Sequence, residues 1–283
     1  MLHCGKFQFD LARPLVMGIV NVTPDSFSDG GRHASAALAI AHARQLVQEG
    51  ADILDIGGES TRPGAAPVGE QEELDRVLPV IESLHGIPVP ISIDTCKPGV
   101  MRAALAAGAS MVNDVNALQA EGALQAVAQS DAAVCLMHKQ GDPQNMQQQP
   151  HYQDVVAEVS MFLRERITAA EAAGIARPRI VIDPGFGFGK TLAHNLALLR
   201  GLEAFRALGV PVLAGLSRKS MLGAITGREV GDRVAASVAA ALLAVQRGAA
   251  IVRVHDVRET VDALKVWQAI NKQTSPQRHR DTE

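Results

Sequence analysis

The sequence predicts an α/β protein that forms a single (β/α)8 barrel with a short N-terminal extension. Three observations predict this fold. The chain has 283 residues, and a barrel of this kind typically needs about 250. Short apolar runs rich in β-branched residues recur eight times along it. Helix-like stretches separate these runs, so strands and helices alternate. An open, doubly wound sheet is the alternative arrangement of the same elements.

The predicted strands are continuously apolar rather than alternating, which is typical of parallel strands buried on both faces. They cover residues 15–20, 52–56, 89–93, 110–113, 132–137, 179–182, 210–214 and 250–254. Helices are predicted over residues 34–48, 70–84, 99–107, 122–129, 155–173, 193–208, 232–247 and 258–270. A glycine separates helix from strand in EGADI, AAGAS, AAGIA, ALGVP and RGAAI. Glycine at these places ends a helix.

The composition indicates one continuous domain. Hydrophobic residues make up 47% of the chain and aromatic residues only 3%, so aliphatic side chains must fill the core. No change of composition marks a second domain, and residues 1–283 are expected to form one unit. We expect the first ten residues to form an extra strand or hairpin. The polar tail over residues 272–283 is expected to be frayed.

Charge and cysteine usage exclude several classes of protein. The net charge is −3 and the sequence contains no run of five like charges, which argues against a nucleic-acid partner. Cys4, Cys96 and Cys135 lack C-x-x-C spacing, so we expect buried or half-buried reduced thiols. No basic-then-apolar N-terminal signal and no membrane-length apolar run is present. We therefore expect a cytoplasmic protein without a membrane partner.

Residues suited to chemistry collect directly after the predicted strands. In strand order they are Asn21, residues 57–64 (GGESTRPG), Asp94 and Lys97, Asn113 and Asp114, His138 and Lys139, Asp183, residues 217–220 (SRKS), and Arg253, His255 and Asp256. In a (β/α)8 barrel these positions open onto one face, where active sites are built. The opposite side is almost bare of such residues. This asymmetry favours an enzyme or a ligand-binding barrel over a structural protein.

Two short motifs in the sequence are misleading. The segment DPGFGFGKT (183–191) looks like a phosphate-binding loop, but that motif needs glycine where Pro184 stands. The segment GLSRK (215–219) looks like a nucleophile elbow, which needs glycine where Lys219 stands. No cluster of histidine and cysteine has zinc spacing.

Four longer segments carry a resemblance to the dihydropteroate synthase family. They are MGIVNVTPDSFSDGG (17–31), DIGGESTRPG (55–64), DPGFGFGK (183–190) and GLSRKS (215–220). Shorter similarities are SIDTCKP (92–98), VNDV (112–115), LMH (136–138) and RVHD (253–256). They occur in order over almost the whole chain. Cys96 stands where the family often has serine, and Asn116 where a basic residue is common; neither has an assigned role.

The resemblance implies a folate-pathway transferase that joins 4-aminobenzoate to 6-hydroxymethyl-7,8-dihydropterin pyrophosphate. The implied pterin site comprises Asp94, Asn113, Met137, Asp183, Phe188, Gly215 and Lys219. For 4-aminobenzoate it implies Thr61, Arg62, Pro63 and Ser220, and for pyrophosphate Asn21, Arg253 and His255. Lys219, Arg253, His255 and Asn21 are expected to act in catalysis. The implied cofactor is Mg²⁺, held by phosphate oxygens and Asn21.

The residue types suit these roles. A carboxylate such as Asp183 accepts from an N–H and an amino group at one ring edge, and the planar fork of Arg253 suits phosphate oxygens. We expect pyrophosphate to leave first, in an SN1-like step, because an aniline nitrogen needs no strong base. Residues 22–33 are expected to form a lid over the site. The segment over 232–247 is apolar on more than one face, which favours a homodimer.

Two other functions remain open on the sequence. A pterin-dependent methyltransferase that works with a corrinoid protein would share Asp94, Asn113 and Asp183, but would not need Arg62 or the Arg253 and His255 pair. A catalytically silent paralogue would be expected to lose Asn21, Arg62, Lys219 or His255. All of these residues are present.

Overall fold

A parallel eight-stranded barrel is the centre of the fold. The computed structural model describes residues 1–22, 31–60, 65–141, 146 and 149–271, and for residues 31–34 it describes the backbone alone. In sheet order the strands are β8 (Ile180–Asp183), β7 (Ala133–Met137), β6 (Met111–Asp114), β5 (Ile91–Asp94), β4 (Ile53–Gly57), β3 (Leu15–Asn21), β10 (Ile251–Val254) and β9 (Leu213–Ala214). A parallel bridge from Ile182 to Val212 joins the two ends of this order. The barrel is therefore closed, and the open-sheet alternative is excluded.

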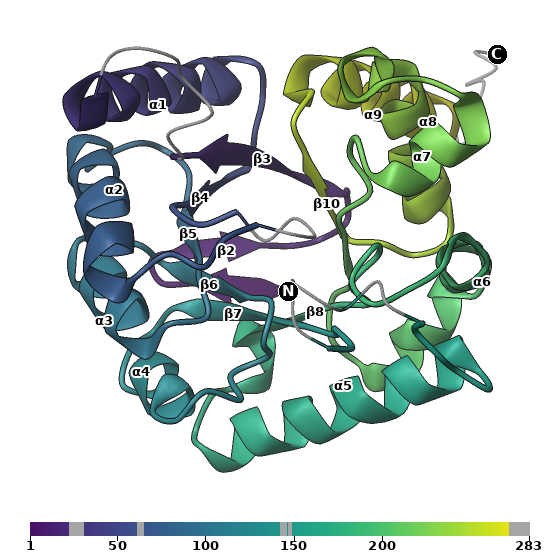
Figure 1. The fold of residues 1–283 in the computed structure, drawn as a ribbon, viewed down its shortest axis with the longest axis horizontal. Coiled ribbons are helices and arrows are strands. Elements are labelled where there is room, and N and C mark those ends of the chain that lie inside the picture. The colour runs from purple at the N-terminus through teal and green to yellow at the C-terminus, as the bar shows by residue number, and fades with distance from the viewer. Residues whose placement is uncertain (23–30, 61–64, 142–145, 147–148, 272–283) are drawn as a thin grey trace, which may run out of the picture.

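Helices surround the strands as a ring (Figure 1). They are α1 (Gly31–Gln48), α2 (Glu70–Ser83), α3 (Pro98–Ala106), α4 (Ala123–Ala128), α5 (Val155–Ala172), α6 (Leu192–Arg200), α7 (Ser220–Thr226), α8 (Val234–Gln246) and α9 (Val257–Asn271). Most lie within three residues of the predicted bounds. Two differences stand out: α7 was not predicted, and the helix predicted over 193–208 ends at Gly201, after which a 3₁₀ helix covers Leu202–Leu208.

The break at Gly201 has a packing cause. A Cβ at this glycine would lie 3.0 Å from a methyl carbon of Val156 on α5, so the chain approaches α5 closely there. Helix α7 escaped prediction because it is short and contains Gly223, which weakens a helix interior.

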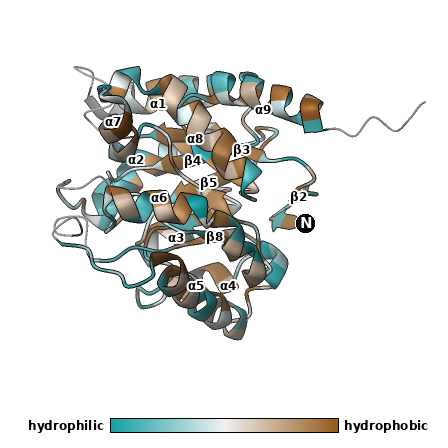
Figure 2. Ribbon diagram, turned by 90° about the vertical axis from the view of Figure 1, so that its right-hand side faces the viewer, coloured by the Kyte–Doolittle hydropathy of each residue, from teal (hydrophilic) through white to brown (hydrophobic). Residues whose placement is uncertain are grey.

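A small hairpin closes the N-terminal end of the barrel, as expected for the first ten residues. Strands β1 (Leu2–Cys4) and β2 (Phe7–Phe9) pair antiparallel, with Leu2 opposite Phe9. Leu2 and Cys4 are fully buried and pack against the apolar side chains inside the barrel. Figure 2 shows the N-terminus and β2 at one end of the molecule and α7 at the other.

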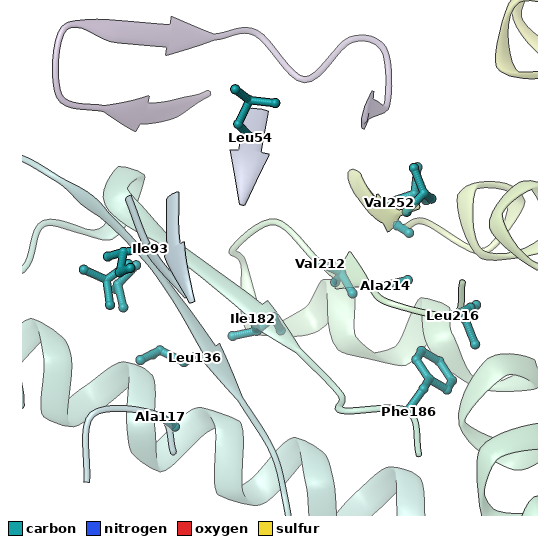
Figure 3. Packing of buried hydrophobic residues seen from close by; sticks show 14 of the residues in the cluster. Leu54, Ile93, Ala117, Leu136, Ile182, Phe186, Val212, Ala214, Leu216 and Val252 are labelled. Carbon is teal, nitrogen blue, oxygen red and sulfur yellow. The ribbon is translucent and has the colours of Figure 1, made fainter. Parts of the chain in front are cut away.

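Two apolar clusters stabilise the fold, one outside the barrel wall and one inside it. The outer cluster lies between strands and helices, and Figure 3 shows some of its members, including Leu54, Ile93 and Leu136. The inner cluster consists of Leu2, Cys4, Leu15, Met17, Ile53, Met111, Ala133, Cys135, Val181, Leu213 and Ile251. Because both faces of each strand are covered, the strands read as continuous apolar runs.

Candidate active site

The candidate site is the next layer of side chains inside the barrel, one step toward the carboxyl ends of the strands. Side chains two residues apart on a strand point to the same face. Counting two residues on from members of the inner cluster therefore predicts which side chains share the interior. These pairs are Ile53 and Asp55, Met111 and Asn113, Cys135 and Met137, Val181 and Asp183, Leu213 and Gly215, and Ile251 and Arg253. One layer further toward the carboxyl ends, the side chains inside the barrel therefore change from apolar to mostly polar or charged. We call the inner cluster the aliphatic layer. We call the second members of these pairs, together with Asp94 and Lys219, the ionic layer.

Arg253 joins the acidic side of this layer. Its Nε donates to Asp55 Oδ2 at 2.6 Å, and its Nη2 donates to Asp94 Oδ2 at 2.7 Å. Asn113 Nδ2 also donates to Asp55 Oδ2, at 3.0 Å. Three side chains predicted from separate strands are thus joined in one network: Arg253 contacts Asp94 directly and is linked to Asn113 through Asp55. Buried charges need such partners, because an isolated ion in a protein interior is strongly unfavourable.

Two carboxylate oxygens in this cluster have no protein partner among the described residues. They are Oδ1 of Asp55 and Oδ1 of Asp94, and both are buried. Buried polar atoms are nearly always hydrogen-bonded in native structures. Unpartnered acceptors inside the barrel mouth are therefore suited to a ligand that brings N–H donors.

Asp183 and Lys219 form the other side of the layer. Asp183 is buried, and its Oδ1 accepts from the Gly185 backbone N–H at 2.7 Å. Lys219 Nζ donates to the Phe186 carbonyl and lies 4.7 Å from the centre of the Phe188 ring. Gly215 faces both groups: a Cβ there would lie 3.8 Å from Asp183 Oδ2 and 3.9 Å from Lys219 Nζ. Glycine leaves open the space beside both charges that a longer side chain would occupy.

Burial changes the ionisation of these groups. It raises the pKa of Asp94 to about 7, although Arg253 opposes that change. It also raises the pKa of Asp183, which Lys219 opposes. The pKa of Lys219 is lowered to about 8 by burial, with Asp183 opposing. Such perturbed groups gathered in one place are a mark of functional sites.

The residues expected to bind pyrophosphate lie at the same end of the barrel. Asn21 is the last residue of β3, opposite Gly57 of β4. His255 follows β10, and its Nδ1 lies 3.0 Å from the hydroxyl of Ser217 after β9. Arg253 is engaged by Asp55 and Asp94 in this structure.

The predicted 4-aminobenzoate residues are only partly described. Thr61, Arg62 and Pro63 lie outside the described residues, as does the central part of the predicted lid, residues 23–30, and the tail, residues 272–283. Ser220 is exposed as the first residue of α7. Glu59, just before this segment, is held by Lys97, which also donates to the buried Glu73.

Sequence reasoning missed one residue inside the site and one that supports it. Asp55 was not singled out because it lies within a strand rather than after one; a lone carboxylate inside the apolar run ILDIG was the available signal. Lys190 lies within the false phosphate-loop motif and within the resemblance segment 183–190, and the sequence assigns it no role of its own. It is almost wholly buried, at 2% exposure, and contacts His138 and the loop after β8.

The closed barrel, with buried carboxylates and an asparagine amide inside its carboxyl end, has the arrangement of a barrel enzyme of the pterin-binding class. Residues 17–255 match the family described as pterin binding enzyme. The dihydropteroate synthase of Neisseria meningitidis serogroup C is 56% identical over 273 residues, which are 95% of this chain and 96% of that protein. The chain belongs to the dihydropteroate synthase family of transferases.

Solved structures agree with this assignment. A Xanthomonas albilineans dihydropteroate synthase with 4-aminobenzoic acid is 62% identical, with a TM-score of 0.88 over 94% of this chain and 95% of that chain. The same organism's enzyme in complex with 7,8-dihydropteroate is 58% identical, with a TM-score of 0.86 over 95% and 97% of the two chains. In the described part of our chain, none of the helices is long and apolar enough to cross a membrane.

Proposed function

We propose that this protein condenses 6-hydroxymethyl-7,8-dihydropterin pyrophosphate with 4-aminobenzoate, giving 7,8-dihydropteroate and pyrophosphate. The observation that carries the proposal is the pair of buried carboxylates inside the barrel, Asp94 at the end of β5 and Asp183 at the end of β8. Asp183 lies beside Gly215, and Asp94 is held by Arg253. A pterin edge carries N–H and amino donors, and carboxylates are acceptors when ionised. Asn113 adds an amide, and Met137 and Phe188 supply apolar contact for the flat ring.

Lys219 has to bind the pterin without opposing the reaction. Its ammonium group would donate to the ring carbonyl or N5, which holds the pterin in place. A cation over the electron-rich ring opposes the positive charge that develops when pyrophosphate leaves. The carbonyl of Phe186 and the ring of Phe188 hold Lys219 to one side, which fits a group that binds the substrate without facing the reacting carbon.

Loss of pyrophosphate is assigned to Asn21, Arg253 and His255. A guanidinium fork and an imidazole donor suit phosphate oxygens. No group of three or more histidine, cysteine, aspartate or glutamate side chains is arranged to hold a metal ion within the described ranges. The proposed Mg²⁺ ion is held mainly by pyrophosphate oxygens, which are hard oxygen ligands, with Asn21 as its protein ligand. When bound, the ion would neutralise charge on the leaving group.

The arylamine is expected to react second. Thr61, Arg62, Pro63 and Ser220 are assigned to 4-aminobenzoate, with the Ser220 hydroxyl near its carboxylate. An aniline nitrogen is already nucleophilic, so the protein contributes positioning rather than a strong base. If pyrophosphate leaves first, the pterin substrate should release it slowly without 4-aminobenzoate. A strict requirement for the arylamine would contradict this order.

The test is an assay that follows dihydropteroate and pyrophosphate together, with Mg²⁺ and both substrates. We expect both products in equal amounts, and loss of both in Asp183→Ala and Lys219→Ala. Binding of pterin without turnover would instead favour a silent paralogue or a methyltransferase. Of these alternatives, neither explains why the chain retains Ser217, Lys219 and His255 together.

We further propose that the protein is a cytoplasmic homodimer that contacts its second copy through α8. This helix reads VAASVAAALLAVQ, and its Leu243 is 41% exposed. An apolar side chain exposed on such a helix is suited to a subunit contact. Light scattering in solution tests this, and a monomeric mass would overturn it.

A further inference from the structure

The loop between β8 and α6, residues 184–190, is held almost entirely by buried side chains from its surroundings. Asn195 of α6 accepts from the Gly187 N–H at 2.7 Å. Tyr152 donates its hydroxyl to the Gly189 carbonyl at 2.9 Å. Asn195 also donates to the Lys190 carbonyl at 3.3 Å. A loop that satisfies its backbone groups in this way has one defined shape rather than many.

Lys190 is the centre of this arrangement. Its Nζ lies 2.9 Å from three acceptors: the carbonyl of Gly185, the carbonyl of Phe188 and Nδ1 of His138. Burial lowers the pKa of Lys190 to about 7. In its protonated form the amine has three donors and no acceptor, so the three short contacts match its capacity. His138 must then accept through Nδ1. It is suited to this, because burial lowers the pKa of its ring to about 3 and keeps it neutral.

The glycines of the loop explain why the side chain of Lys190 is needed to fix the shape of the loop. Gly185, Gly187 and Gly189 have φ values of +70°, +81° and +61°, which favour glycine. A Cβ at Gly185 would lie 1.8 Å from the His138 carbonyl, and one at Gly189 would lie 2.3 Å from the Gln140 carbonyl. The loop therefore presses its backbone against residues 138–140. Glycines give the loop this path but also make it flexible in the absence of a clamp.

The residues between these glycines reach the candidate site. The Phe186 ring is fully buried in the outer cluster, near Leu216 in Figure 3, while the Phe186 carbonyl accepts from Lys219 Nζ. The Phe188 ring packs against the same ammonium group. The Gly185 N–H binds Asp183. One short loop thus orients the two charged groups assigned to the pterin.

We infer that Lys190 is a positioning residue for the reaction: it clamps the loop so that Phe186, Phe188 and Gly185 hold Lys219 and Asp183 in place. Lys190 does not itself touch the substrate. Its role rests on the proposed function, because it acts through residues assigned to the pterin. The alternative is that Lys190 only stabilises the fold.

The first test is Lys190→Met, with Lys265→Met as the matched control. Methionine is of similar length but leaves the Gly185 and Phe188 carbonyls without their donor. Displacement of reacting groups by about 1 Å can lower rates about 100-fold, and we expect a fall of that size in kcat/KM for the pterin substrate. Lys265 is exposed, at 70% for its side chain, and its substitution should leave kcat/KM unchanged.

Tyr152→Phe is the second test, because it loosens the same loop without changing charge and keeps the ring. The loss of one hydrogen bond to Gly189 should lower kcat/KM about fivefold. As water gains access to Lys219, its pKa should rise, and the alkaline limb of the activity profile should move to higher pH. A change in stability alone would not move that limb.

The outcomes separate the possibilities. A folded Lys190→Met protein with wild-type kcat/KM would overturn the positioning role. The positioning role would also be overturned if both variants lost activity only in proportion to their loss of folded protein and the alkaline limb of the activity profile did not move. If Lys190→Met does not fold, Tyr152→Phe decides alone. If the wild-type chain makes no dihydropteroate, the proposed function fails instead, and calorimetric binding of 6-hydroxymethylpterin to both variants still tests the clamp.

Discussion

The two ends of the barrel interior have the same geometry but opposite chemistry. At the N-terminal end, Ile53, Val181 and Ile251 pack against the hairpin, and the layer is fully buried. Two residues further along the same strands stand Asp55, Asp183 and Arg253. The spacing that brings the first set together brings the second set together as well. The aliphatic layer and the ionic layer thus lie one side chain apart on the same strands.

The comparison shows how stability and function are separated within one structure. Aliphatic packing contributes favourable free energy at the closed end. The ionic layer places three carboxylates, those of Asp55, Asp94 and Asp183, near Arg253 and Lys219. Burial raises the pKa of Asp94 and of Asp183 and lowers the pKa of Lys219, which in each case favours the neutral form. Such a layer is costly to the fold and useful to a ligand. Substitutions in the two layers should therefore have opposite consequences.

Asp183→Asn should have the largest effect on activity. Asparagine places an NH₂ donor where the pterin needs an acceptor, so two charge-assisted hydrogen bonds are lost. Each contributes about 1.5–3 kcal/mol, and kcat/KM should fall about 10³-fold. Steady-state kinetics with the pterin substrate measures this loss. A fall of less than tenfold would remove Asp183 from the pterin site.

The same variant should not destabilise the fold at pH 8. Burial raises the pKa of Asp183, so the folded protein holds that proton more tightly than the unfolded chain does. The stability associated with the protonated form is therefore present at low pH and is lost as the pH rises through the folded pKa. Urea unfolding at pH 8 should give a free energy equal to or above that of the wild type. At pH 4 the advantage should be smaller.

Ile251→Ala tests the closed end. Ile251 is fully buried in the inner cluster, and comparable truncations cost about 2–5 kcal/mol of unfolding free energy. Because the change is confined to the aliphatic layer, kcat/KM should stay close to the wild-type value at a temperature where the variant is folded. A large loss of activity in well-folded protein would show that the two layers are mechanically coupled.

The strands and most helices were predictable because burial on both faces and helix-ending glycines leave strong local patterns. The strand prediction over 132–137, for example, differs from β7 by one residue. Site residues at the strand ends were predictable for the same reason: the barrel brings all such ends to one face. Asp94, Asn113, Asp183 and Arg253 all lie inside that face as expected.

The rest depended on contacts that carry no local signal. Asp55 and Arg253 are 198 residues apart, and the residues that flank each of them in the sequence do not indicate that they form a pair. Lys190 reads as a surface lysine until the loop around it is built. The subdivision of the helix predicted over 193–208 depends on how closely Gly201 approaches Val156. Each of these features is a property of the packed molecule, and none could be obtained from the residues nearby in sequence.

Activity should depend on pH through the ionic layer. Asp94 must be ionised to accept from the pterin, and its pKa is about 7. Lys219 must be protonated to donate, and its pKa is about 8. Asp94 becomes protonated as the pH falls below about 7, and Lys219 becomes neutral as the pH rises above about 8. The value of kcat/KM should therefore follow a bell-shaped profile. Because the groups interact, the two limbs belong to the cluster as a whole.

Lys219→Arg assigns the alkaline limb. Arginine stays protonated to pH values far above 8, so the variant should be less active but should lose its decline above pH 8. The acid limb near pH 7 should remain. A profile whose alkaline limb is unchanged in this variant would assign that limb to a group other than Lys219.

The smallest effects should come from thiol chemistry, which probes the two layers without disturbing them. Cys4 and Cys135 lie in the aliphatic layer, whereas the half-buried Cys96 follows β5 at the mouth. Burial raises the pKa of Cys4 to about 12 and that of Cys96 to about 11, and it also raises the pKa of Cys135. A disulfide reagent at pH 8 should therefore modify one thiol, slowly, in the native protein.

The rate at which the reagent modifies Cys96 is the more specific measurement. The pKa of Cys96 lies about two units above the ordinary value of 9.0, so its thiolate fraction at pH 8 should be about 100-fold below that of a free thiol. Unfolding in urea should expose all three thiols, and Cys96→Ser should abolish the native reaction. If Cys4 or Cys135 reacted in the folded state, the closed end would open in solution, and the aliphatic layer would not be the rigid base on which the ionic layer stands.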